Sequence, residues 1–274
     1  MNQMINRLDA MKKILLTLAA LLLVSSAYGL DCEVNCYNVV VTTPEFEFDN
    51  SISVGVAGSV GQSPYKKYDA SWMIAPLVLH DSKYFYLQGT SGGFYLFNNG
   101  THKISAGISY FGLEFDRHDT DNRQLKQLDS RRSTLMGEIG YSVVTPIGLA
   151  SFELGRDLLG HSDGYVADAS LGVPWITDRF TIMPTVGVTW SSRKQSDYYF
   201  GISRGESNRS GLKQHTAKAN FSPYIEVEMK YNITERWSAV AGVNVNFLTG
   251  SVKNSPMVGR SATVGGFLGC AFKF

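Results

Sequence analysis

The stretch that decides the fold is SATVGGFLGCAFKF, residues 261–274 at the end of the sequence. Every second residue in it is apolar or glycine: Ala262, Val264, Gly266, Leu268, Cys270, Phe272 and Phe274. The residues between them are mostly small or polar. Because successive side chains of a strand point to opposite faces, this period of two predicts a strand with one apolar face.

The same alternation recurs upstream, most clearly in residues 132–145, 179–192, 219–232 and 235–249. Two architectures produce such a pattern. In a soluble sandwich the apolar faces pack against each other in a core. In a membrane barrel the apolar faces point to lipid and the polar faces line the interior.

Three features favour the membrane barrel. The alternating segments are long enough to cross a bilayer at a tilt. Aromatic residues such as Trp237 and Phe247 stand at their ends, where barrels carry interfacial girdles. The chain also stops on Phe274, preceded by Phe272 and Gly269, which resembles the terminal assembly signal of bacterial outer-membrane barrels, although that signal often begins with a polar residue. We therefore predict an all-β fold, a transmembrane antiparallel β-barrel over residues 51–274.

The composition excludes several other classes. The 274 residues are 44% hydrophobic and 18% charged, with a formal net charge of +1 and a mean hydropathy of −0.07. No apolar run beyond residue 24 is long enough for a membrane helix, which excludes a helical bundle. The near-neutral charge argues against a nucleic-acid partner.

The N-terminus has the pattern of an export signal. The basic pair Lys12-Lys13 precedes an apolar run, residues 14–24, and small residues follow that run. This pattern predicts a cleaved signal peptide over residues 1–29, with Met11 as the true start. Export and a barrel together indicate the outer membrane of a Gram-negative cell.

A periplasmic arm, residues 30–50, is expected between the signal peptide and the barrel. It contains Cys32 and Cys36, which in an oxidising compartment either form a small disulfide loop or stay free thiols. Cys270 lies within the last alternating segment, where we interpret it as a small apolar side chain.

Twelve strands are predicted, an even number as expected for a closed bacterial barrel. Their ranges are 51–61, 70–80, 83–90, 93–98, 102–115, 132–145, 148–157, 164–175, 179–192, 219–232, 235–249 and 261–274. If the chain enters from the periplasm, the long connections all fall outside and the short turns inside, as in outer-membrane barrels. Reading residues 83–98 as one bent strand would put the connection 116–131 on the wrong side, so we keep two strands there.

Charged residues fall on the predicted inner face. They are Glu138, Glu153, Asp168, Glu226, Glu228 and Lys230. We interpret them first as part of a hydrated or salt-bridged lumen; the alternative is a charge-selective pore.

Few residues are of the types that bind metals or catalyse reactions. For each of them we prefer the interpretation that it has no such role. His118 with Asp116, Asp119 and Asp121 has the ligand types of a divalent-cation site, but solvated loop charges explain them as well. We therefore predict no metal site and no cofactor.

A hydrolase site near the outer rim would draw on Asp119, His161 and His215. No nucleophile motif accompanies these residues. We accordingly predict no catalytic residues and a protein that is not an enzyme.

An aromatic cluster, Tyr198, Tyr199 and Phe200, has Arg204 and Arg209 nearby. These residues are of the types that bind sugars or lipopolysaccharide at a rim. The interpretation that we prefer is that they extend a strand beyond the bilayer and fold the connection 193–218 over the lumen.

Several passages resemble the MipA/OmpV family of Gram-negative outer-membrane proteins. They are SPYKKY at 63–68, LKQLDSRRST at 125–134, DYYFGIS at 197–203, ESNRSGL at 206–212 and SPMV at 255–258. They are spread over nearly the whole mature chain, in the order that the family shows. The cysteine pair of the arm is not part of that pattern.

The resemblance implies an outer-membrane barrel in contact with lipid and lipopolysaccharide. One member of the family is described as a scaffold that links a lytic transglycosylase to a bifunctional murein synthase, so the resemblance implies a non-enzymatic organiser of peptidoglycan synthesis. Two alternatives stay open: a narrow pore for small solutes, and an outer-membrane hydrolase.

Overall fold

The computed structural model describes residues 51–274. The predicted signal peptide, the arm 30–50 and Cys32 and Cys36 lie outside the described residues. The wall consists of β1 (Ser53–Gly61), β2 (Ser71–Asp81), β3 (Phe85–Gln88), β4 (Ser91–Asn98), β5 (His102–Phe111), β6 (Thr134–Thr145), β7 (Gly148–Asp157), β8 (Tyr165–Gly172), β10 (Phe180–Ser191), β11 (Asn220–Asn232), β12 (Trp237–Phe247) and β13 (Ala262–Lys273). A two-residue strand, β9 (Trp175–Ile176), pairs with β10.

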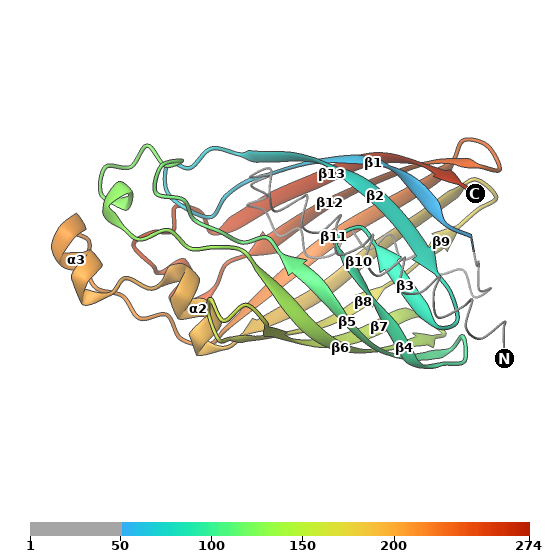
Figure 1. Ribbon diagram of the computed structural model, residues 1–274, viewed down its shortest axis with the longest axis horizontal. Coiled ribbons are helices and arrows are strands. Elements are labelled where there is room, and N and C mark those ends of the chain that lie inside the picture. The colour runs from blue at the N-terminus through green and yellow to red at the C-terminus, as the bar shows by residue number, and fades with distance from the viewer. Residues whose placement is uncertain (1–50) are drawn as a thin grey trace, which may run out of the picture. The chain divides into compact units, whose positions relative to one another are not determined.

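Each wall strand pairs antiparallel with the next one along the chain, and β1 pairs with β13, which closes the barrel (Figure 1). The predicted barrel of twelve strands is thus confirmed, including the separate strands β3 and β4. Gly89 permits the tight turn between these two, because its φ of +57° suits glycine. Among residues 51–274, no helix is long and apolar enough to cross a membrane.

The apolar parity of each strand faces outward. Trp72 and Leu268 are 70% and 67% exposed, whereas Val240 and Ala271, on the opposite parity, are fully buried inside. A soluble sandwich would show the reverse, because its apolar faces form the core. The outward apolar surface is the one expected of a barrel in lipid.

The connections differ in length at the two ends of the barrel. Turns at one end cover only 82–84, 99–101, 146–147 and 233–236, and the segment 173–179 contains β9. The long connections, up to residues 192–219, lie at the other end, opposite the C-terminus (Figure 1). Outer-membrane barrels turn their long loops outward, so we refer to these ends as periplasmic and outer.

Two predicted strands end earlier than expected. The fifth was predicted to reach residue 115 but ends at Phe111, because the chain then leaves the wall and buries Phe115 among the outer loops. The eighth was predicted to reach residue 175 but ends at Gly172, before Pro174, which lacks the N–H needed to continue a ladder.

The prediction that Tyr198, Tyr199 and Phe200 extend a strand is wrong, because they lie in a helix, α2 (Arg193–Phe200). The hydroxyl of Ser192 accepts the N–H of Gln195 and caps this helix. Three more short helices occur in the outer loops: η1 (Leu125–Gln127), α3 (Arg204–Ser210) and α4 (Gly250–Lys253).

Candidate functional site

The interior of the barrel carries the first candidate site. Five carboxylates face inward from β6, β7, β8 and β11, as predicted: Glu138, Glu153, Asp168, Glu226 and Glu228. We call this set the acidic row. Neighbours along the strands, such as Ile139 and Val227, point outward and are exposed.

The members of the acidic row lie near one another. Glu153 is directly opposite Asp168 in the β7–β8 register. Glu153 is also close enough to Glu138 to interact with it electrostatically, as Glu226 is to Asp168 and to Glu228. The row therefore follows the inner wall across adjacent strands.

Neutral hydroxyls donate hydrogen bonds to two members of the acidic row, Glu138 and Asp168. The hydroxyl of Ser109 donates to Glu138. Thr189 and Tyr224 donate to the two oxygens of Asp168 over 2.7 and 2.9 Å. Tyr224 packs against Gly187, where a Cβ atom would come within 2.4 Å of its ring. The glycine thus makes room for the side chain that orients Asp168.

Cations on the inner face do not neutralise the row. Lys103 forms an ion pair of 2.9 Å with Asp81, which also accepts the hydroxyl of Tyr95 at 2.8 Å. Lys230 is the next inward residue after Glu228, but among residues 51–274 no ion pair involves Lys230 or any carboxylate of the acidic row.

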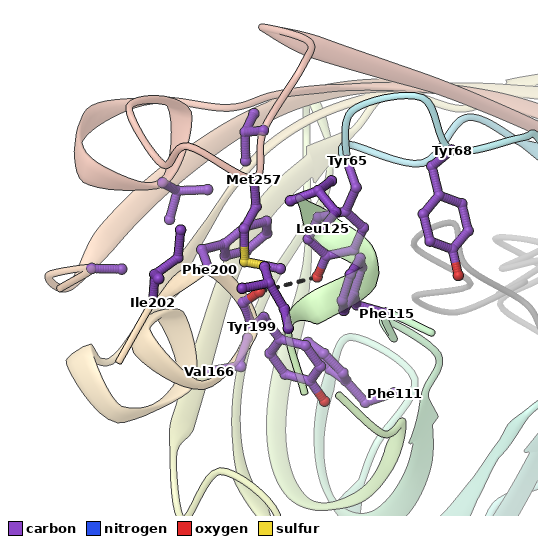
Figure 2. Close-up of a cluster of buried hydrophobic side chains, with 14 of the residues drawn as sticks. Tyr65, Tyr68, Phe111, Phe115, Leu125, Val166, Tyr199, Phe200, Ile202 and Met257 are labelled. Carbon is purple, nitrogen blue, oxygen red and sulfur yellow. Dashed lines mark hydrogen bonds between the residues drawn. The ribbon is translucent and has the colours of Figure 1, made fainter. Parts of the chain in front are cut away.

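The outer loops form a second feature, which we call the outer cap: a hydrophobic cluster contributed by loops 62–70, 112–133, 192–219 and 248–261. Inward-facing residues at the outer ends of the strands, such as Phe111, belong to the same cluster, so the loops fold inward over the mouth (Figure 2).

Aromatic contacts join loops that are far apart in sequence. The ring of Tyr65 lies 5.0 Å from Phe115 and 5.8 Å from Phe200, and Phe111 lies 5.5 Å from Tyr199. The hydroxyl of Tyr65 donates to the backbone oxygen of Tyr199 at 3.2 Å (Figure 2).

A buried ion pair joins two of these loops. Arg131 and Glu206 meet at 2.7 Å, and their side chains are only 10% and 3% exposed. Glu206 also accepts the backbone N–H of Asp129 at 3.1 Å and of Ser203 at 2.9 Å. Burial alone would raise the pKa of Glu206, but these hydrogen bonds and the charge of Arg131 outweigh it, so the pKa lies below its usual value.

The sequence contains a recognisable signal for one partner of this pair but none for the pair itself. Ser203 and Glu206 form a capping box at the start of α3, a spacing that can be recognised in sequence. No such rule links Arg131 to Glu206 across 75 residues.

The possible metal ligands form contacts with other residues of the outer loops. His118 pairs with Asp116 at 2.9 Å, both exposed, whereas Asp119 accepts the hydroxyl of Tyr68 at 3.3 Å. The backbone N–H of Asp121 donates to Lys67. Within residues 51–274, no group of three or more His, Cys, Asp or Glu side chains is arranged to hold a metal ion.

The histidines predicted as possible hydrolase residues are bonded to backbone oxygens of neighbouring loops. The His161 ring bonds the backbone oxygen of Ser133 at 2.9 Å, and the His215 ring bonds that of Ser251 at 2.8 Å. Each ring therefore ties one outer loop to another.

The aromatic cluster of Tyr198, Tyr199 and Phe200 is largely buried. Tyr199 and Phe200 are buried in the outer cap, and the hydroxyl of Tyr198 accepts the N–H of Arg132 at 2.9 Å. Arg209 pairs with Asp129 at 2.9 Å, and Arg204 is exposed at the start of α3. The two buried rings hold the cap together and are not available to bind a sugar.

A closed barrel with an apolar outer surface, a polar interior and long loops at one end defines an outer-membrane β-barrel protein. The chain belongs to the family described as MltA-interacting protein MipA, whose model matches residues 54–274. The resemblance to the MipA/OmpV family is thereby confirmed.

Individual relatives are named either for an interaction with MltA or as outer membrane proteins. The MltA-interacting protein of Escherichia coli (strain K12) is 34% identical over 226 residues, covering 82% of this chain and 91% of that protein. The putative outer membrane protein YiaT of the same strain is 30% identical, covering 82% and 92%. The outer membrane protein OmpV of Vibrio cholerae serotype O1 is 24% identical, covering 59% and 60%. The predicted location, the outer membrane, agrees with these names.

Proposed function

We propose that this chain is a non-enzymatic outer-membrane scaffold that binds a lytic transglycosylase and a bifunctional murein synthase at its periplasmic end. The observation that carries the proposal is the 34% identity, over nearly the whole length, to a protein named for its interaction with MltA. The outer cap is turned away from the periplasm, so a periplasmic partner has to dock on the turns of the barrel or on the arm 30–50.

Site-specific crosslinking in intact cells tests this proposal. A photo-crosslinking amino acid is placed at Asn99 or Ile147, in two periplasmic turns, and at Glu45 in the arm, with Lys126 of the outer cap as the matched control. We expect the transglycosylase and the synthase among the products of the first three positions only. Their absence from all three, in cells that insert the barrel normally, would remove the scaffold proposal.

The acidic row favours a second candidate function, a narrow cation-selective pore. Carboxylates that pair with no cation in the described part of the chain lower the electrostatic energy of a cation inside the barrel and raise that of an anion. Planar-bilayer recordings test it. We expect discrete conductance steps with a reversal potential shifted toward cations, and a smaller shift in Glu226→Gln. Silent membranes with correctly folded protein would argue against a pore.

A further inference from the structure

The acidic row has a property that a hydrated wall alone does not explain. Glu228 is only 6% exposed, and its buried Oε1 atom has no hydrogen-bond partner among residues 51–274. Its strand neighbours Val227 and Met229 face outward, so the carboxylate points to the interior. A buried carboxylate without a donor is costly, and a positively charged donor from outside the chain would remove that cost.

The strand partners of Glu228 supply no such donor. On the two adjacent strands it lies opposite Met183 in β10 and Gly242 in β12. Neither residue has a side chain that donates a strong hydrogen bond. The nearest inward cation along β11, Lys230, forms no ion pair with any residue in the described range 51–274. Glu226 is close enough to interact electrostatically, and the two carboxylates together repel anions and attract a cation.

The geometry selects an organic cation over a metal ion. None of the described acidic side chains gathers in a group of three that would hold a metal, whereas a calcium site brings several carboxylate and carbonyl oxygens together at one point. The carboxylates are instead distributed along the wall from β6 to β11, four strand spacings or roughly 19 Å at about 4.8 Å each. Tyr86 and Tyr224 lie beside them, and tyrosine rings attract ammonium groups.

We propose that the acidic row is a binding site for an aliphatic polyamine, whose ammonium groups bind to successive carboxylates, one of them to Glu228. An ammonium group supplies three hydrogen-bond donors and the missing positive charge. A flexible chain with several amines matches carboxylates that are spread over adjacent strands. This inference deepens the pore proposal by naming a solute class, but it requires binding only and not conduction.

Calorimetric titration of the purified full chain in detergent with spermidine tests the inference. We expect saturable binding to the wild type and an affinity at least tenfold lower in the double variant Glu226→Gln/Glu228→Gln. The matched control is Glu235→Gln, which removes an exposed carboxylate from the turn between β11 and β12 and leaves the affinity unchanged. Glu153→Gln provides a second test should the double variant not fold, as judged by heat-dependent gel mobility.

Three outcomes would overturn the inference: no binding to the folded wild type, equal affinity for wild type and the row variants, or equal affinity for Mg²⁺ and spermidine. The last would mean general charge screening. If the chain binds spermidine but gives no conductance in planar bilayers, the pore proposal is refuted and the binding-site proposal stands. Cation-selective conductance without spermidine binding would refute the site and keep the pore.

Discussion

Replacing Glu206 by Gln is expected to loosen the outer cap without opening the barrel wall. The substitution keeps the shape of the side chain but leaves Arg131, which is 10% exposed, without its counterion. It also weakens acceptance of two backbone N–H groups, those of Ser203 and Asp129. Breaking a buried ion pair from one side costs about 3 kcal/mol at the lower end of the usual range, which corresponds to a roughly 100-fold change in the opening equilibrium.

Hydrogen–deuterium exchange measures this opening directly, because a local opening free energy sets amide protection. The amides to follow are Ser207 and Gly211, which bond within α3 at 2.9 Å each. The control is Asp129→Asn, which breaks the pair with Arg209, where the side chains are 63% and 50% exposed. An exposed pair contributes at most about 1 kcal/mol, so protection should change by less than about fivefold.

The reasoning would be refuted if the Glu206 and Asp129 variants lost similar protection. It would also be refuted if the strands of the wall lost protection together with α3, because the pair would then support the whole barrel.

Three further predictions concern pH, interior packing and the lipid face. Because the pKa of Glu206 is lowered in the folded cap, the stabilisation from its charge is complete above the ordinary Glu pKa of about 4.3 and is lost as the pH falls through the lowered folded value. The protection of α3 amides, corrected for the intrinsic exchange rate, should therefore be constant from neutral pH down to about 5 and fall in stronger acid. A loss of protection between pH 8 and 6 would contradict this assignment. Gly187→Ala places a Cβ 2.4 Å from the Tyr224 ring and should lower the free energy of unfolding in urea by about 1–3 kcal/mol. Gly58→Ala, whose Cβ would lie 3.8 Å from the backbone oxygen of Met73, should change it little; equal effects would rule out the packing argument. Ile225→Arg, on the outward face, should cost about 2–4 kcal/mol in lipid vesicles, and Asn244→Arg, on the inward face, should cost less; the reverse order would contradict the orientation of the strands.

The wall of the barrel was predictable because it is repetitive. A period of two over a dozen residues, as from Phe221 to Tyr231, leaves one strand orientation that puts apolar groups on one side. The alternation of long and short connections then fixes the direction of each strand. The short strand β9 was missed because two residues, Trp175 and Ile176, are too few to show a period.

The outer cap was not predictable in the same way, since no single loop contains its own core. Tyr199 and Phe200 are of a residue type that favours strands, but in the cap they lie in a helix, where their rings contact Phe111 and Tyr65. The alternation in the sequence predicts that the acidic row faces inward, whereas the lack of a partner for Glu228 within residues 51–274 depends on its neighbours in three dimensions.

The interdependence of the four loops in the outer cap determines when they can acquire their structure. The bond from Tyr65 to Tyr199 joins residues 134 positions apart, and such long-range contacts form late because the intervening chain must first be ordered. We therefore expect the cap to become organised only after the strands that carry its four loops have come together. It follows that a synthetic peptide copied from one loop does not reproduce the cell-surface epitope, and that antibodies against such a peptide should fail to recognise intact bacteria.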